Sequence, residues 1–159
     1  MFGSFVAATL TASGRPFGER EGAWYDEHVK AHEYDGMVAT ARAIRAHGCA
    51  VVLSAPFTEQ IRNAVEWERF VDALGGPPLH LLWVRSDVAT LRARLGRRQS
   101  SRDAAKVAHF DEFVLRMQPD VPPPVPHIAV DNRDSAPTDL ETQLRTVVAG
   151  HREDGRGSD

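Results

Sequence analysis

Apolar residues follow two patterns along this chain, short continuous runs and stripes at helical spacing. Continuous runs of four to eight apolar residues are typical of strands that are covered on both faces. Three such runs predict strands at 49–55, 79–85 and 127–130. The first of them, CAVVLSA, is the clearest strand pattern in the chain, and Pro56 ends it.

Helical stripes occupy the segments before, between and after these runs. We expect helices at about 1–12, 23–47, 58–74, 86–98, 101–117 and 138–149. Side chains that can accept a backbone N–H predict where these helices begin: Thr58, Ser86 or Asp87, Ser101, and Thr138 in a capping box with Glu141. The proline-rich stretch 119–126 is predicted to be an extended connection.

Alternation of strands and helices implies right-handed crossovers and a parallel sheet. The predicted fold is therefore a three-layer α/β fold with helices on both faces of the sheet. We expect one domain at 1–149 and a disordered tail at 150–159, GHREDGRGSD, which has nothing to bury. In such folds ligands bind outside the carboxyl ends of the strands. The side chains to inspect are therefore those after each run.

Composition narrows the classes of function. The chain has 159 residues and a net charge of −3, which argues against a nucleic-acid partner. Cys49 is the single cysteine, so the sequence predicts no internal disulfide and no cysteine-based metal site. No apolar segment approaches the roughly 20 residues that span a bilayer, and the N-terminus shows no leader pattern. We expect no membrane partner and a cytoplasmic location.

Arginines gather at the end of the helix predicted at 86–98. Val88, Leu91 and Leu95 would face the sheet, so the charged side chains point elsewhere. They are Arg92, Arg94, Arg97 and Arg98, with Arg102 four residues later. Guanidinium groups stay charged and match phosphate oxygens in pairs, which suits a di- or triphosphate. The alternative is a solvated, arginine-rich helix face.

Three stretches of the sequence resemble the later part of P-loop kinase-like ATP-binding proteins. They are VVLSAPF at 51–57, LLWVRSDVATLRARLGRRQSSRDAAKVAHFDEF at 81–113, and HIAVDN at 127–132. The resemblance is to the AAA-type kinase-like ATPases, near the gluconate, shikimate, adenylate and chloramphenicol kinases, and it covers roughly residues 30–149.

The resemblance implies ATP and Mg²⁺ as cofactors and phosphoryl transfer to a small-molecule acceptor. It implies that Arg94 packs on the adenine and that Arg98 reaches the phosphates. Arg97 and Arg102 are further phosphate candidates, and Arg98 and Arg102 are those expected to assist catalysis. Asp131 and Asn132 would lie beside the adenine ring.

The sequence departs from this family at the N-terminal side. It lacks the loop G-x-x-x-x-G-K-[ST] that cradles phosphates, and neither Lys30 nor Lys106 follows a glycine. FVAATLTASGRPF at 5–17 resembles the region that follows the second strand. The resemblance thus implies that the central first strand is missing between the runs at 49–55 and 79–85. We expect negligible catalysis if the chain truly begins at Met1, and self-association through the incomplete sheet.

Two functions stay open on the sequence alone. The first is an ATP-dependent phosphotransferase-like protein in which residues 13–35 approach the acceptor through His28, His32, Glu33 and Asp35. The second is a non-catalytic module that binds a nucleotide or a partner. We predict no metal site, because His28 and His32 stand without an identified third ligand.

Overall fold

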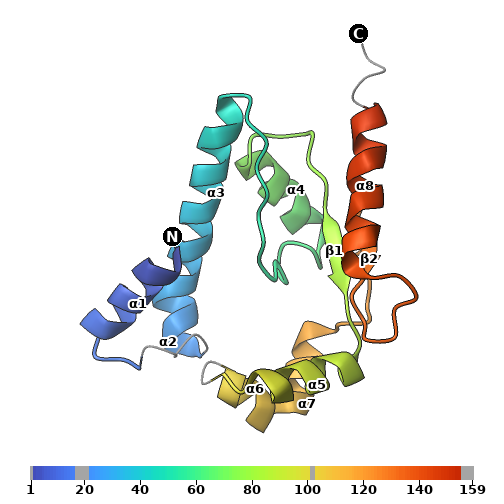
Figure 1. Ribbon diagram of the computed structural model, residues 1–159. Coiled ribbons are helices and arrows are strands. Elements are labelled where there is room, and N and C mark those ends of the chain that lie inside the picture. Colours follow the sequence, from blue (N-terminus) through green and yellow to red (C-terminus); the bar gives the residue numbers. More distant parts are fainter. Residues whose placement is uncertain (1, 17–21, 101–102, 155–159) are drawn as a thin grey trace. The chain divides into compact units, whose positions relative to one another are not determined.

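The computed structural model describes residues 2–16, 22–100 and 103–154 (Figure 1). The chain divides into two compact units. The first unit comprises Met1–Leu79 and Ser100–Ala104, and the second comprises His80–Gln99 and Ala105–Asp159. The prediction of one domain at 1–149 stays a prediction.

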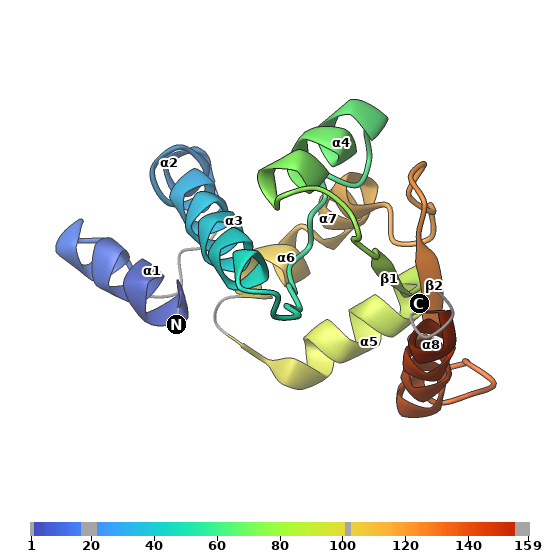
Figure 2. The same cartoon turned by 90° about the horizontal axis from the view of Figure 1, so that it is seen from above.

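Helices and extended chain make up the first unit. Its elements are α1 (Phe2–Ala12), α2 (Ala23–Tyr25), the π-helical turn η1 (Asp26–Lys30), α3 (Ala31–Ala46) and α4 (Ala64–Ala73). Helical turns follow one another without a break from Ala23 to Ala46, which confirms the helix predicted at 23–47. Figure 2 shows α1 beside α3, and the two helices are in contact.

A small apolar core holds these helices together. Val6 and Leu10 lie four residues apart, so they share one face of α1, and both are fully buried. They pack with Tyr25 and Val29, and Trp24 covers the cluster from its partly exposed edge. The Tyr25 hydroxyl donates to Glu33 Oε2 at 2.7 Å, so the polar end of this buried ring is satisfied.

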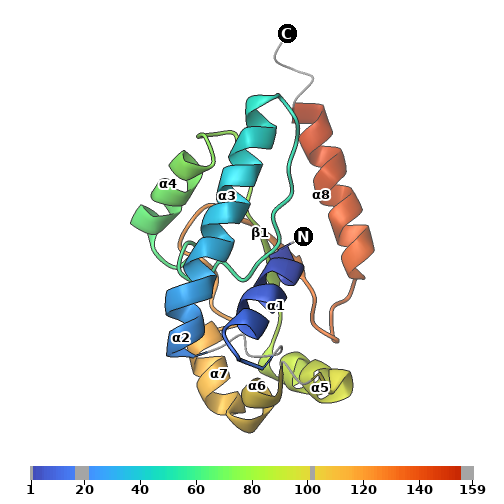
Figure 3. The same cartoon turned by 90° about the vertical axis from the view of Figure 1, so that its left-hand side faces the viewer.

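The strand predicted at 49–55 is absent from the structure, so that prediction is wrong. Residues 51–54 form an extended chain outside any strand (Figure 3). Exposure alternates along it, as in a strand, and Val52 is 95% exposed. A strand is completed by hydrogen bonds to a neighbour, and among the described residues the backbone at 50–55 has no ladder partner. The sequence here has the pattern of a strand, but among the described residues no neighbouring strand pairs with it.

Helix α4 begins later than the sequence suggested. Its cap is Asn63, whose Oδ1 accepts from the backbone N–H of Val65 at 2.8 Å, so the prediction of Thr58 as the cap is wrong. The far end of α4 is tied to α3. The Arg45 guanidinium donates to the carbonyls of Leu74 at 2.6 Å and Gly76 at 2.7 Å, and so satisfies oxygens that the helix end leaves without a donor.

The second unit contains the sheet. Strands β1 (Leu82–Arg85) and β2 (Ile128–Asp131) are parallel, with Leu82 opposite Ile128 and Arg85 opposite Asp131. The described residues of this unit also include the helices α5 (Val88–Arg98), α7 (Phe110–Met117) and α8 (Leu140–Asp154), and α6 (Ala104–Ala108) from its second residue on. The pairing confirms two of the three predicted strands and their parallel direction.

Apolar residues from several elements form the core of this unit. Its buried side chains include Leu95, Phe110, Val125 and Val130. Helix α8 packs on β2 and begins after Asp139, whose carboxylate accepts from the Thr142 N–H at 2.9 Å. Asp139 therefore occupies the capping position predicted for Thr138. The helix continues to Asp154, past Gly150, where we expected disorder, and residues 155–159 lie outside the described part.

These observations correct the predicted fold class. The described chain is mostly helical, and its strands form one small sheet of two parallel strands instead of a three-layer parallel sheet of the P-loop type. The physical reason is that the run at 49–55 acquires no neighbour and so adds nothing to the sheet. In the part of the chain that was searched, no helix is long and apolar enough to cross a membrane.

Candidate anion-binding site

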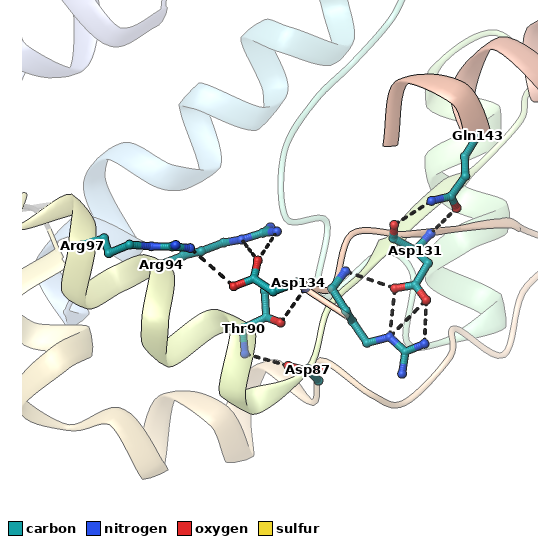
Figure 4. A network of polar contacts seen from close by, with 8 residues as sticks. Asp87, Thr90, Arg94, Arg97, Asp131, Asp134 and Gln143 are labelled. Carbon is teal, nitrogen blue, oxygen red and sulfur yellow. Dashed lines mark hydrogen bonds and ion pairs between the residues drawn. The ribbon is translucent and has the colours of Figure 1, made fainter. Parts of the chain in front are cut away.

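Polar side chains gather beyond the carboxyl ends of β1 and β2 (Figure 4). Because parallel strands end at the same edge of a sheet, the loop after Arg85 lies beside the loop after Asp131. The first loop contains Ser86 and Asp87 and leads into α5. The second contains Asn132, Arg133 and Asp134. All of these residues belong to the second unit.

Asp87 fixes the start of α5. Its backbone is extended, and its Oδ1 accepts from the Thr90 N–H at 2.7 Å. This confirms one of the two caps predicted for this helix. The pKa of the Asp87 carboxyl is lowered, chiefly by that hydrogen bond, so the cap is an anion at neutral pH. Thr90 is 3% exposed, and its Oγ1 accepts from the Asp134 N–H at 3.0 Å. The first turn of α5 therefore holds the loop at Asp134.

Two arginines converge on the Asp134 carboxylate. Arg94 donates to Oδ1 from Nε at 3.2 Å and from Nη2 at 2.8 Å. Arg97, three residues later on the same face of α5, donates to Oδ2 from Nη2 at 3.4 Å. We call Thr90, Arg94, Arg97 and Asp134 the Asp134 cluster. It carries two positive charges and one negative charge, so its net charge is one positive.

The Asp134 cluster is open to solvent. The side chains of Arg94, Asp134 and Arg97 are 38%, 46% and 68% exposed. Ion pairs this exposed are each worth at most about 1 kcal/mol, so a ligand with stronger charges can replace them. The cluster thus presents guanidinium groups that are already oriented but are weakly held by their present partner.

A second ion pair joins the same loop to the last residue of β2. Arg133 donates to both carboxylate oxygens of Asp131, at 2.6 Å from Nη2 to Oδ2 and 2.9 Å from Nε to Oδ1. These bonds lower the pKa of Asp131 to about 2. The Asp131 backbone is fixed from α8, since its N–H donates to Gln143 Oε1 and its carbonyl accepts from Gln143 Nε2. The Asp131 carboxylate is therefore engaged by the loop that follows it.

The residues predicted to bind nucleotide divide into two groups. Arg94 and Arg97 come together on Asp134, Asp131 is the last residue of β2, and Asn132 lies in the loop that also contains Asp134. Arg98 is the last residue of α5 and is exposed. Arg102 lies outside the described residues. Beside them, Arg85 Nε and Ser86 Oγ are buried polar atoms that lack a hydrogen-bond partner among the described residues.

Sequence reasoning missed the partners of the arginines. Asp134 stands 40 residues from Arg94, and helical periodicity carries no information over that distance. One signal was present, because Asp134 follows a predicted strand end and therefore lies at the edge where ligands bind. Thr90 gave no signal, since its hydroxyl could as well have bonded within its own helix.

The residues predicted to meet an acceptor lie in the first unit. His28 stacks on Trp24 with ring centroids 4.9 Å apart, and its Nδ1 lies 3.0 Å from the Trp24 carbonyl oxygen. Glu33 accepts from the Tyr25 hydroxyl, and His32 and Asp35 are exposed. Among the described residues, no group of three or more His, Cys, Asp and Glu side chains could hold a metal ion.

Comparisons with family models, curated proteins and solved structures found no match for this chain. Its function therefore has to be inferred from its own residues and their geometry.

Proposed function

We propose that the second unit binds the polyphosphate of a nucleotide, with ATP as the ligand, through Arg94 and Arg97. The observation that carries this proposal is the convergence of two guanidinium groups on one carboxylate at the sheet edge. A carboxylate and a phosphate present their oxygens to a guanidinium with the same fork geometry. Asp134 therefore marks the position where phosphate oxygens would be bound.

Charge and position support a phosphate ligand over a neutral one. The Asp134 cluster keeps a net positive charge even with Asp134 in place, and Arg98 adds another cation at the end of the same helix. A nucleotide triphosphate brings three to four negative charges in a short chain, so it can contact several guanidinium groups at once. The cluster also lies beyond the strand ends, where ligands of parallel sheets bind.

ATP is proposed because the sequence around these arginines resembles kinase-like ATP-binding proteins. By that resemblance Arg98 and Arg102 also face the phosphates, Asp131 and Asn132 lie near the base, and Mg²⁺ arrives on the phosphates of ATP. Transfer of a phosphoryl group to a small-molecule acceptor rests on the resemblance alone. The proposal therefore concerns binding first.

We also propose a cytoplasmic location for the protein, because a lone thiol such as Cys49 stays reduced there.

Calorimetric titration with MgATP tests this function. Removing one charge-assisted pair costs about 1.5–3 kcal/mol, so Arg94→Ala should weaken binding about tenfold to a hundredfold. Arg145→Ala is the matched control, because Arg145 is an exposed arginine of α8 paired with Glu141. It should leave the affinity within about twofold. Equal affinities for wild type and Arg94→Ala, or no saturable binding by the wild type, would refute the proposal.

A second candidate function is contact with another copy of this chain, and the exposed segment at 50–54 favours it. No Asp, Glu, Lys or Arg occurs between Arg45 and Glu59. Two copies paired antiparallel about Val52 would therefore oppose no like charges within the segment, and the basic end of α3 in one copy would face Glu59 in the other. Main-chain hydrogen bonds between the copies would complete the ladder.

Sedimentation velocity over a hundredfold range of protein concentration tests this second function. Val52→Lys should abolish a concentration-dependent dimer, because it places two charges opposite each other at the centre. Val65→Lys is the matched control, since Val65 of α4 is also an exposed valine of the first unit. A wild type that stays monomeric throughout, or two variants that behave alike, would rule the contact out.

A further inference from the structure

We propose that Asp134 is an internal competitor for the anion site, so that only ligands with several adjacent negative charges bind at low concentration. This inference rests on the proposed function of Arg94 and Arg97. It adds a regulating residue to that site and a ligand class, polyphosphates over monophosphates.

Asp134 occupies the donor groups that a phosphate would need. Arg94 gives it Nε and Nη2, and Arg97 gives it Nη2 (Figure 4). A guanidinium has a limited number of N–H groups in a fixed fork, so the same groups cannot bond fully to two anions. A ligand that uses them must displace the carboxylate.

Asp134 also stays close to the arginines after displacement. Its backbone N–H is bonded to Thr90 Oγ1, and Thr90 is buried in the first turn of α5. Asp134 also lies inside a turn, because the Ala136 N–H donates to the Arg133 carbonyl at 3.1 Å. A competitor tethered in this way acts at a high effective concentration, which free anions at low concentration cannot match.

Charge decides which anions overcome this competitor. Asp134 brings one negative charge to two guanidinium groups, so a free monoanion that replaces it gains nothing electrostatically. Inorganic phosphate or a nucleoside monophosphate brings at most two charges on one centre. Pyrophosphate and nucleoside triphosphates bring three or more, spread over neighbouring phosphates, and can reach Arg94 and Arg97 together. Asp134 therefore raises the concentration that every anion needs for binding. Polyphosphates, with their larger charge, still bind at low concentration.

The experiment compares wild type and Asp134→Asn by calorimetry with pyrophosphate, ATP and inorganic phosphate, all without Mg²⁺, because a bound Mg²⁺ cancels two of the charges of ATP. The amide keeps the size of the side chain and the backbone N–H that bonds to Thr90, but it loses the charge. Two exposed ion pairs to one carboxylate correspond to about threefold to twentyfold in affinity. Asp134→Asn should bind pyrophosphate and ATP tighter by that factor, and binding of inorganic phosphate should become measurable.

The matched control is Asp111→Asn. Asp111 is an exposed carboxylate of α7 that accepts from Arg92 of α5 at 3.1 Å and does not belong to the Asp134 cluster. Loss of the Asp111 charge should change the affinity for each of the three anions by less than about twofold. A second variant, Thr90→Val, keeps every charge but removes the acceptor for the Asp134 N–H. It loosens the tether, so it should also tighten pyrophosphate binding, by a smaller factor than Asp134→Asn.

The outcomes separate the competitor from the site itself. If Asp134→Asn binds the anions more weakly than wild type, Asp134 is not a competitor but a residue that positions the arginines. Unchanged binding would overturn the competition as well. In both cases the site survives if Arg94→Ala still loses affinity. If neither wild type nor Asp134→Asn binds any of the three anions, the proposed function fails together with the inference.

Discussion

β2 and the segment at 49–55 have the same kind of sequence but different structures. Both are short apolar runs that contain valine, and both were predicted as strands. Val130 of β2 is 1% exposed, whereas Val52 at the centre of the other run is 95% exposed. β2 pairs with β1 and is covered by α8, while the described backbone at 50–55 has no ladder partner. A strand pattern indicates only a tendency, because a strand forms only when a neighbouring strand pairs with it.

The largest expected effect comes from truncating the two valines. Val130→Ala should cost about 2 kcal/mol in the free energy of unfolding, because it removes two buried methyl groups and leaves a cavity. Val52→Ala should change it by less than about 0.5 kcal/mol, since that side chain is already in water. Urea denaturation measures both. A Val52→Ala cost as large as that of Val130→Ala would show that 49–55 is buried in solution and would break the comparison.

A smaller effect is the pH dependence of stability that the ion pair at the end of β2 produces. Arg133 lowers the pKa of Asp131 to about 2, whereas an unfolded aspartate titrates near about 3.9. The folded form binds protons less readily, so the stabilisation by this pair is complete above the unfolded pKa. It is lost as the pH falls through the folded pKa. The segment at 49–55 contains no carboxylate and should contribute no such dependence.

Urea denaturation of wild type and Asp131→Asn at pH 7 and at several values down to pH 2.5 checks this prediction. The difference in stability between them should be largest at pH 7 and should shrink between about pH 4 and pH 2.5. A difference that is constant across this range would mean that the carboxylate is not paired with Arg133 in solution. Asp111→Asn, which changes an exposed carboxylate, serves as the control.

Local features of the fold were predictable because nearby residues determine them. The helix at 23–47 and the cap at Asp87 follow from spacing and from a side-chain acceptor next to its donors. The parallel pairing of two runs followed from the helices between them. The sheet as a whole was not predictable. Its size depends on whether each run finds a neighbour, and the run at 49–55 fulfils every local rule without finding one.

The candidate site shows the same limit. The arginine face of α5 could be predicted, because Arg94 and Arg97 are three residues apart on one helix. Their convergence on Asp134 could not, because an ion pair between exposed residues distant in sequence leaves no periodic signal. The resemblance to kinase-like ATP-binding proteins assigned Asp131 to the ligand, beside the adenine ring. Its pairing with Arg133, two residues later, is a local bond that the sequence equally allowed.

The central claim is that Arg94 and Arg97 exchange the Asp134 carboxylate for the phosphates of ATP. The most direct measurement is the NMR spectrum of the arginine Nε–H groups during a titration with MgATP. The Arg94 and Arg97 resonances, assigned from Arg94→Lys and Arg97→Lys spectra, should move and saturate together while that of Arg145 stays fixed. Unmoved Arg94 and Arg97 resonances at saturating MgATP, or equal shifts of every arginine, would contradict it.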